Sequence, residues 1–381
     1  LVHETSFESF VTTNLKPILT CDQHGVSGFL FLASLLAYVR FRGLDGVGMT
    51  RGRSAAMFVV SLVLFVLALT SKTTACSLPA VVALLIWWKT NRLDWKDVPL
   101  LVPFFALGIW FGLRTASVEK QTSFVGTVTA LDLSLVERCL IAGRAIWFYA
   151  VKLMVPVPLM FVYPRWQPDI GDWVQVLYPL GVIAAAAILW FSRFRIGRGP
   201  LVGVLCFCGT LFPALSFFDV YFMRFSFVAN HFSYLSSMAL IALIVAVGHL
   251  AIEQIRIAWS GPIVAAIVVA VLGTMTWNHS REFLDEESLW THAIEKNPDA
   301  WVAHNNLASI FRHRGDVGAA VRHYRAALTV NFDLFESHNG LMEIFRIAGD
   351  FDQALIHGRH ALELATERNK VALHNNIAQI L

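Results

Sequence analysis

The strongest constraint on this chain is a series of long apolar runs that fills the sequence as far as Asn278. A helix needs about 20 apolar residues to cross the hydrocarbon core of a bilayer, and eight runs reach that length. They are centred near Leu32, Val63, Ala83, Phe105, Ala184, Gly209, Leu243 and Val268. The mean hydropathy is +0.59 and only 15% of residues are charged, which indicates lipid as the main solvent. Residues 1–278 are therefore predicted to form an all-α polytopic membrane domain.

Lysine and arginine gather in every second connection between these runs. Basic residues mark the cytoplasmic side of a membrane protein, so four connections are expected there. Their basic residues are Arg40, Arg42, Arg51 and Arg53, then Lys89, Arg92 and Lys96, then Arg193, Arg195 and Arg198, and finally Arg256. By parity, segments 114–137, 157–172 and 219–233 and everything after Asn278 lie on the opposite side. The net charge of +3 comes from residues beside apolar runs, so no nucleic-acid partner is expected.

One apolar stretch, residues 138–156, does not fit the parity of the others. A full crossing there would place Arg193, Arg195 and Arg198 on the wrong side. The stretch also carries Arg144 and Lys152, and a charge at the bilayer centre costs about 2.5–3.5 kcal/mol on insertion scales. Residues 138–156 are therefore predicted to be re-entrant or interfacial. A crossing paired with a second hidden one is the alternative.

Between Asn297 and Ala361 one sequence pattern occurs twice. The positions Leu307, Ala308, Phe311, Gly315, Asp316, Ala320 and Ala327 recur as Leu341, Met342, Phe345, Gly349, Asp350, Ala354 and Ala361. This constant spacing, and the alternation of small and large residues within it, are typical of the tetratricopeptide repeat, whose length is about 34 residues. Residues 279–381 are therefore predicted to form a tetratricopeptide α-solenoid.

The ends of this array look incomplete. Trp290 stands one repeat length before Tyr324 and indicates the second helix of a degenerate first repeat, while HNNIA at 374–378 echoes HNNLA at 304–308. Repeats need stacked neighbours and a polar cap, so further repeats are expected after Leu381. The chain also begins without methionine, and an upstream segment is expected before Leu1.

The first helix of each repeat would line a concave groove. The polar residues it offers are Asn305, Ser309, Arg312, Asn339 and Arg346. Asparagine side chains can hold the backbone of an extended peptide, so the groove is a candidate for binding a peptide or an acceptor protein. The alternatives are that Asn305 and Asn306 only solvate a helix start, and that the array is a spacer or self-associates.

Charged residues on the predicted exoplasmic side form three clusters. In the first, Arg144, Lys152 and Arg165 could neutralise a lipid phosphate or pyrophosphate beside Tyr163 and Trp166. The alternative is that these cations reach the membrane surface along their alkyl chains and the aromatic residues sit in the interfacial belt.

The second cluster is the aromatic stretch 217–235, with the polar residues Asp219, Arg224, Asn230 and His231. Its density of rings suits stacking on a sugar or capping a lipid, although a histidine beside a span is more often interfacial than catalytic. The third cluster is the polar turn 71–79 with Lys72, for which a structural hairpin is expected.

Several function classes lack their minimal parts. The chain has no H-E-x-x-H, no Walker loop and no G-x-S-x-G, which disfavours metalloproteases, nucleotide-driven transporters and hydrolases. Its five cysteines show no disulfide or zinc spacing, and Cys206 and Cys208 are interpreted as packing residues. No cofactor is predicted, and a divalent metal would need ligands that the sequence does not display. The function classes that these absences do not disfavour are transferases and non-enzymes.

Four motifs together resemble a known family. SKTTACSLP with a following WWK, GRAIWFYAVKLMVP ending in YPRW, LFPALSFFDVYFMRFSFVANHFSYLSS, and NPDAWVAHNNLA look like bacterial relatives of the transmembrane and tetratricopeptide-repeat-containing O-mannosyltransferases. The resemblance covers nearly all of residues 25–381. It implies the C-type glycosyltransferase superfamily, whose members transfer a sugar from a polyprenyl-phosphate donor on the exoplasmic face. It also implies a bacterial inner-membrane protein with periplasmic repeats and a lipid-linked sugar as donor.

The resemblance assigns residues to the donor site and leaves the catalytic ones unassigned. By position, Arg144, Lys152, Arg165 and His231 are the donor phosphate candidates. The family places a catalytic acid, usually Asp, in the first exoplasmic loop, which is expected in the segment upstream of Leu1. It also has an acidic residue where Asn230 stands, and an amide cannot ionise. The prediction is a hexosyltransferase activity of the complete protein that modifies a protein acceptor, and the alternative is a non-catalytic scaffold that binds proteins through its repeats.

Overall fold

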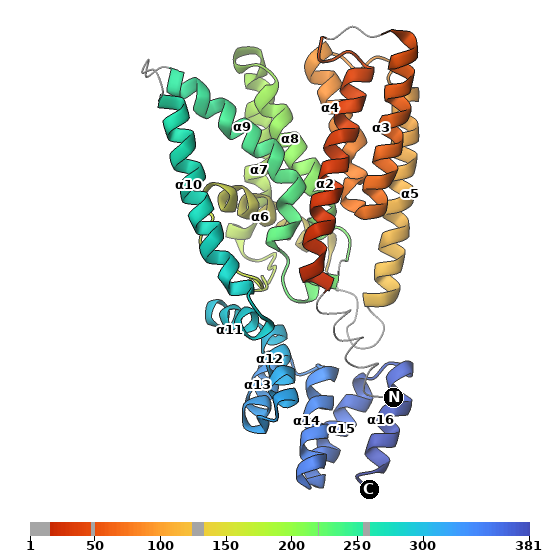
Figure 1. Ribbon diagram of the computed structural model, residues 1–381, viewed down its shortest axis with the longest axis vertical. Coiled ribbons are helices and arrows are strands. Elements are labelled where there is room, and N and C mark those ends of the chain that lie inside the picture. Colours follow the sequence, from red (N-terminus) through yellow and green to blue (C-terminus); the bar gives the residue numbers. More distant parts are fainter. Residues whose placement is uncertain (1–15, 47–49, 124–132, 220, 254–259) are drawn as a thin grey trace.

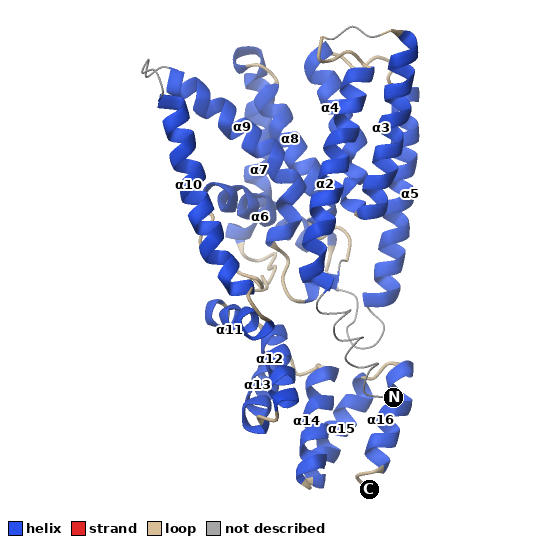
Figure 2. Ribbon diagram, in the orientation of Figure 1, coloured by secondary structure: helices blue, strands red, loops and turns tan. Residues whose placement is uncertain are grey.

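The computed structural model describes residues 16–46, 50–123, 133–219, 221–253 and 260–381. Within these ranges the chain is helical and contains no strand (Figure 2). The α-helices are α2 (Lys16–Phe41), α3 (Arg51–Ser71), α4 (Leu78–Thr90), α5 (Val98–Ser123), α6 (Leu135–Met154), α7 (Trp173–Ile196), α8 (Gly199–Leu211), α9 (Tyr234–Glu253), α10 (Ser260–Ser280), α11 (Glu286–Lys296), α12 (Trp301–Arg314), α13 (Val317–Val330), α14 (Phe335–Ala348), α15 (Phe351–Leu364) and α16 (Glu367–Ala378). Short 3₁₀ turns are η1 (Thr73–Ser77), η2 (Phe212–Ala214), η3 (Tyr221–Arg224), η4 (Asn230–Ser233) and η5 (Arg281–Phe283).

The molecule is elongated, with a bundle of long helices at one end and a tail of shorter helices at the other. Helices α2–α5 and α7–α10 run roughly along the long axis, and α11–α16 project from the lower end of the bundle (Figure 1). The α4–α5 and α7–α8 connections lie at the end of the bundle away from the tail (Figure 1). Two of the lysine- and arginine-rich connections are therefore opposite the tail.

In the part of the chain that the structure describes, seven helices of the bundle are long and apolar enough to cross a membrane. These candidate spans are His24–Phe41, Gly52–Ser71, Thr73–Thr90, Val98–Val118, Trp173–Ile196, Asn230–Ile252 and Gly261–Phe283. They indicate an integral membrane protein, and they account for seven of the eight predicted runs. The run near Gly209 differs, because it forms only a shorter apolar helix, Gly199–Ala214. Arg198 precedes this helix and Pro213 ends it, which limits its length to about 24 Å at 1.5 Å per residue.

One core of the bundle is formed by α2, α3, α4 and α5, with Val202 and Cys206 of α8 packed against them. Large side chains such as Tyr38, Phe65 and Phe104 are fully buried there. Between α2 and α3, the hydroxyl of Ser34 donates to the carbonyl of Ser61 at 2.7 Å, and Ser61 donates to the carbonyl of Ser34 at 2.8 Å. Small residues with satisfied hydroxyls let two apolar helices approach closely, which is how helices associate in lipid.

Helix α6 differs from the long helices around it. It is absent from the candidate spans, and Figure 1 shows it lying across their direction. Ser134 and Glu137 form a capping box at its start. Gly143 allows the crossing with α7, because a Cβ at this position would lie 2.5 Å from the nitrogen of Pro179. The re-entrant or interfacial placement of residues 138–156 stays a prediction. A segment placed in that way would lie across the long helices, as α6 does.

The tail consists of helix pairs that recur at the predicted spacing. Helix α14 begins one repeat length after α12, α15 begins one repeat length after α13, and each pair packs together. Gly315 and Gly349 end the first helix of each pair in the left-handed region, at φ 87° and 76°. Asp316 and Asp350 then cap the second helix, each accepting from a backbone N–H three residues later.

The tail packs against the loops at the end of the bundle through an apolar cluster. Val162, in the loop after α6, packs with Leu289 and Trp290 of α11 and with Ala303 and Leu307 of α12. Phe225 of the aromatic stretch lies with its ring 5.0 Å from that of Trp301. The first helices of the tail therefore form part of the same packed structure as the loops at the end of the bundle.

Candidate functional site

The three polar clusters predicted from the sequence meet at one short turn. This turn is η4, residues Asn230–Ser233, between the aromatic stretch and α9. Asn230 contacts the loop after α6, which belongs to the first cluster. The ring of His231 lies 5.3 Å from that of His24, which hydrogen-bonds to Lys72 of the third cluster. We refer to this region, at the tail-facing end of the bundle, as the η4 site.

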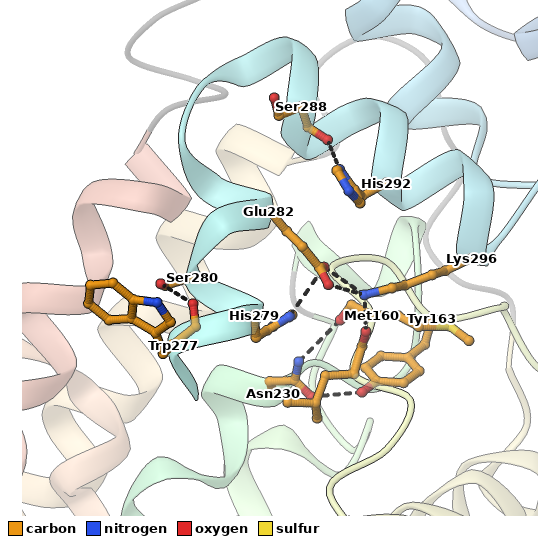
Figure 3. A network of polar contacts seen from close by, with 11 residues as sticks. Met160, Tyr163, Asn230, Trp277, His279, Ser280, Glu282, Ser288, His292 and Lys296 are labelled. Atoms are coloured by element: carbon orange, nitrogen blue, oxygen red, sulfur yellow. Dashed lines mark hydrogen bonds and ion pairs between the residues drawn. The ribbon is translucent and has the colours of Figure 1, made fainter. Parts of the chain in front are cut away.

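Asn230 is held by two hydrogen bonds to the loop after α6. Its amide nitrogen donates to the carbonyl of Met160 at 3.1 Å, and its amide oxygen accepts from the hydroxyl of Tyr163 at 2.9 Å (Figure 3). One residue earlier, the carbonyl of Ala229 accepts from the buried hydroxyl of Tyr149 at 3.2 Å. Burial raises the pKa of both phenols, so both stay protonated near neutral pH. Asn230 therefore acts as a fixed hydrogen-bonding group.

A cavity of about 210 Å³ opens beside Asn230. Its lining residues are Tyr149, Lys152, Leu153, Leu159, Phe207, Asn230, Ser233, Ser237 and His279. The volume is below the roughly 300–1,000 Å³ of pockets that enclose a whole small molecule. The cavity is therefore large enough for only part of a ligand, and the rest of the ligand would extend outside it.

Lys152 is the predicted donor-site cation that reaches this cavity. Its Nζ donates to the carbonyls of Val157 and Pro158 at 2.9 and 2.8 Å. It also lies 6.0 Å from the ring centres of Phe148 and Tyr163. Desolvation lowers the pKa of Lys152 from its ordinary value. These neutral partners fix the position of the ammonium group without neutralising its charge.

On the other side of η4, three basic side chains lie together. The Nζ of Lys72 hydrogen-bonds to Nε2 of His24, and the rings of His24 and His231 are 5.3 Å apart. His24 is 7% exposed. Lys72 follows directly after α3, so the hairpin at 71–79 does more than connect two helices: it carries a cation to the η4 site. His24 was not predicted from the sequence. Its only signal was a polar residue at the start of the first apolar run.

Arg144 and Arg165, the other predicted donor-site cations, do not line the cavity. The Arg144 guanidinium lies 4.4 Å from the ring centre of Trp166 and 5.8 Å from that of Tyr178. The exposed Arg165 lies 5.2 Å from the ring centre of Phe227. These contacts match the sequence-based alternative, in which the arginines pack on aromatic residues. The structure therefore brings Lys152 and His231 to the η4 site and places both arginines on aromatic rings beside it.

An acidic residue is present at the edge of the cavity, on the segment that leads into the tail. Glu282 of η5 accepts from Lys296 of α11 at 2.6 Å through both carboxylate oxygens, and it lies 3.2 Å from Nδ1 of His279 (Figure 3). Lys296 also donates to the carbonyl of Leu159 at 2.9 Å. Sequence reasoning missed this group because His279, Glu282 and Lys296 lie where the apolar run gives way to the repeat pattern.

The five predicted peptide-binding residues of the tail lie on α12 and α14. The side-chain oxygen of Asn305 accepts from the hydroxyl of Ser337 at 2.9 Å, which joins the two helix pairs. Ser309 is buried, and Arg346 donates to Glu343 at 3.0 Å. Arg312 and Asn339 are partly exposed. Asn305 and Ser309 therefore contribute to packing between helices, and Arg312, Asn339 and Arg346 are the other partly exposed polar groups of this face.

The remaining predictions concern metals and the catalytic acid. Among the described residues, no group of three or more His, Cys, Asp or Glu side chains is arranged to hold a metal. His3, Glu8 and Ser9, which faintly resemble the family's segment after its first exoplasmic loop, lie outside the described ranges. Comparison of the sequence with known protein families and with curated proteins finds no match. The groups that the site offers for chemistry are three basic side chains, an ammonium at a cavity, and a His–Glu pair.

Proposed function

We propose that this chain is a membrane hexosyltransferase that takes a sugar from a polyprenyl-phosphate donor and transfers it to a protein. The observation that carries the proposal is the convergence of Lys72, His24, His231 and Lys152 on η4 at the membrane end that faces the tail. A phosphate ester buried at a membrane needs cationic hydrogen-bond donors. Two of the four groups are also the positions that the family resemblance assigns to donor binding.

In this proposal the two sides of η4 have different tasks. Lys72 and the two histidines would hold the phosphate, Lys72 with its ammonium and each neutral histidine with one ring N–H. The cavity beside Asn230 would hold the sugar, where Asn230 lines the wall and its amide is fixed by the hydroxyl of Tyr163. Lys152 would stabilise the charge that develops on the leaving phosphate oxygen. The polyprenyl chain would extend along the apolar outer faces of the bundle, where α7 and α10 have many exposed large apolar side chains.

The proposal includes the fold and the placement in the membrane. We assign residues 1–278 to a C-type glycosyltransferase-like bundle and 279–381 to tetratricopeptide repeats, supported by the regular spacing of α12–α15 and the paired glycine caps. The tail and the η4 site would be periplasmic, since they lie opposite the basic α4–α5 and α7–α8 connections. The tail would present the acceptor polypeptide, using Arg312, Asn339 and Arg346, directly beside the sugar site.

Donor binding tests this function. The full chain would be reconstituted in liposomes and incubated with radiolabelled polyprenyl-phosphate mannose or glucose. Lys72→Met and Lys152→Met are each expected to weaken donor binding by about 10–100-fold, because a hydrogen bond to a charged group contributes about 1.5–3 kcal/mol. Lys89→Met is the matched control, since Lys89 lies in the last turn of α4 over the ring of Trp88, beside the connection at the far end of the bundle.

The comparison with uncharged lipid separates the proposed function from its alternative. Wild-type protein should bind the phosphate-linked sugar in preference to the free polyprenol. Equal binding of both lipids would overturn the proposal and favour the non-catalytic scaffold. Equal donor affinity of the Lys72, Lys152 and Lys89 variants would reject the assignment of the phosphate site to η4.

A further inference from the structure

The loop after α6 is held by side chains that donate to its backbone carbonyls. Lys152 and Asn230, which line the cavity, donate to it from α6 and η4. Lys296 and Asn297 donate to it from the tail. Within residues 157–160 every carbonyl accepts such a bond. Because a loop lacks the regular backbone hydrogen bonds of a helix, these side chains fix its path.

The two donors from the tail are adjacent residues at the end of α11. Nζ of Lys296 lies 2.9 Å from the carbonyl oxygen of Leu159, and Nδ2 of Asn297 lies 3.2 Å from that of Val162. Asn297 and Val162 are both buried, so water does not readily replace the bond between them. A buried polar group that loses its partner bears a desolvation penalty. The loop is therefore stabilised in this conformation by the tail.

The loop and the tail both reach the lining of the cavity beside Asn230. Leu159 is one of the lining residues, and His279 is another. Lys296 acts on the second as well, because it holds both oxygens of Glu282 at 2.6 Å, and Glu282 lies 3.2 Å from Nδ1 of His279 (Figure 3). Two of the lining residues are thus positioned by one ammonium group of the tail.

We propose that Lys296 and Asn297 are positioning residues of this cavity, through which docking of the tail controls donor binding. The inference rests on the proposed function, because it takes the polyprenyl-phosphate donor as the ligand of the cavity. While the tail is docked, the loop holds Lys152 and Asn230 in place for the donor. When α11 moves away, two carbonyls of the loop lose their donors, and the cavity loses its shape.

The coupling acts in both directions. A ligand that binds the docked state more tightly than the released state shifts the protein toward the docked state, and docking raises the affinity for the ligand by the same factor. A donor bound against Lys152 and Asn230 therefore strengthens the docking of α11. The tail, which carries the proposed acceptor face, is held most firmly when the sugar is present. The expected order of binding is donor first and acceptor second.

The repeat pattern supplies a matched control for Asn297. Asn331 stands one repeat length later, and the two residues cap the C-termini of α11 and α13 with the same backbone hydrogen bond. The side-chain oxygen of Asn331 accepts from the backbone N–H of Asp333 at 3.2 Å, within the tail. Asn331→Ala therefore makes the same change at the same place in a repeat, without removing a bond to the loop.

Donor affinity tests the coupling in the full chain, reconstituted in nanodiscs. Asn297→Ala and Lys296→Met are each expected to weaken binding of radiolabelled polyprenyl-phosphate mannose or glucose by about 5-fold or more, although neither residue lines the cavity. Asn331→Ala should keep the wild-type affinity. In wild-type protein the donor should slow hydrogen exchange of α11, and this effect should be lost in Asn297→Ala.

Trypsin cleavage after Arg165 measures the loop without any ligand. Arg165 is exposed and follows the loop segment that the tail holds. Cleavage at such a site follows the local opening of the chain. Mass spectrometry of this cut should show it to be several-fold faster in Asn297→Ala and Lys296→Met than in wild-type protein, and unchanged in Asn331→Ala.

The outcomes separate the inference from the proposed function. If Asn297→Ala and Lys296→Met are cut after Arg165 at the wild-type rate, the tail does not fix the loop, and the inference is wrong whether or not the donor binds. If the loop opens while donor affinity is unchanged, the inference is also wrong, and the proposed function stands. If wild-type protein does not bind the donor, the proposed function fails, and the inference with it.

Discussion

Acidification from pH 7 to pH 4 is expected to open the helix pairs of the tail while the membrane bundle stays folded. Two histidine pairs link the helices of these pairs. Nδ1 of His338 in α14 lies 3.0 Å from Nδ1 of His357 in α15, and Nδ1 of His304 in α12 lies 3.1 Å from Nδ1 of His323 in α13. The same contact thus recurs in successive repeats.

Each pair can hold one proton between its two Nδ1 atoms, and no more. In each pair, Nε2 of the first histidine lies 3.0–3.1 Å from a backbone carbonyl, of Phe332 or of Pro298, to which it donates. Its Nδ1 therefore accepts from the second histidine. When both rings are protonated, two N–H groups and two positive charges face each other at this distance. Acid therefore favours separation of the two helices.

The sign of the effect follows from the shifted pKa values. Burial, followed by the charges of His338, His360 and Arg325, lowers the pKa of His357 to about 4. Burial likewise lowers the pKa of His304, His323 and His338, opposed by Asp299 at His304 and by Asp333 at His338, whereas Arg322 acts in the same direction at His323. Because an unfolded histidine titrates near 6.5, the unfolded tail binds more protons below that pH.

The free energy of unfolding should therefore be largest above pH 6.5 and fall as the pH drops from about 6.5 to about 4. His357 alone should account for roughly 2 kcal/mol, after discounting for its partial exposure. Hydrogen exchange of α12–α15, corrected for the intrinsic effect of pH, would measure the opening. His357→Gln should make exchange of α14 and α15 less sensitive to pH, whereas substitution of the exposed His374 should not. Equal pH midpoints for the two variants would contradict the mechanism.

Much of the fold could be predicted because both parts of the chain carry strong periodic signals. Seven apolar runs became long helices, and the recurrence of Gly315 and Asp316 as Gly349 and Asp350 marks the turns within both helix pairs. The helix near Gly209 was predicted too long, because hydropathy alone does not register that Pro213 ends the helix. Local composition thus predicts which segments are helical better than it predicts where they end.

The candidate site was only partly predictable, since its residues come from distant parts of the chain. Lys152 and His231 could be identified as polar residues within aromatic, apolar surroundings. Their neighbours could not be identified in this way: His24 lies far before Lys72 in the sequence, and Lys296 lies far along the chain from Leu159, whose carbonyl it contacts. Arg144 has the same sequence signal as Lys152, yet it stacks on Trp166. A charged side chain in an apolar segment needs a partner. The packing of the folded chain, which the sequence does not show, determines which partner it has.

Replacing Gly340 by alanine is expected to destabilise the tail, although alanine ordinarily favours a helix. Gly340 is buried in α14, and a Cβ there would lie 2.7 Å from both Cε2 and the hydroxyl oxygen of Tyr324 in α13. Tyr324 is itself 3% exposed and packs with Ala308, Ala320 and Leu341, so its ring cannot move aside. The repeat pattern gave no sign of this contact, because Asn306 occupies the equivalent position in the preceding helix pair.

The expected cost of Gly340→Ala is about 1–3 kcal/mol from overpacking, and a leucine at this position should cost more. Gly318→Ala is the matched control: in α13 a Cβ would meet only ordinary contacts of 3.6 and 3.7 Å, so the change should be neutral or stabilise the helix by up to about 1 kcal/mol. Denaturant unfolding, combined with hydrogen exchange of α13–α15, would measure both variants in the full chain. Since each helix pair is stabilised by its neighbours, faster exchange should extend from α14 to α13 and α15. Equal stability of the two variants would show that Tyr324 yields, and that the contact does not fix how these helices pack.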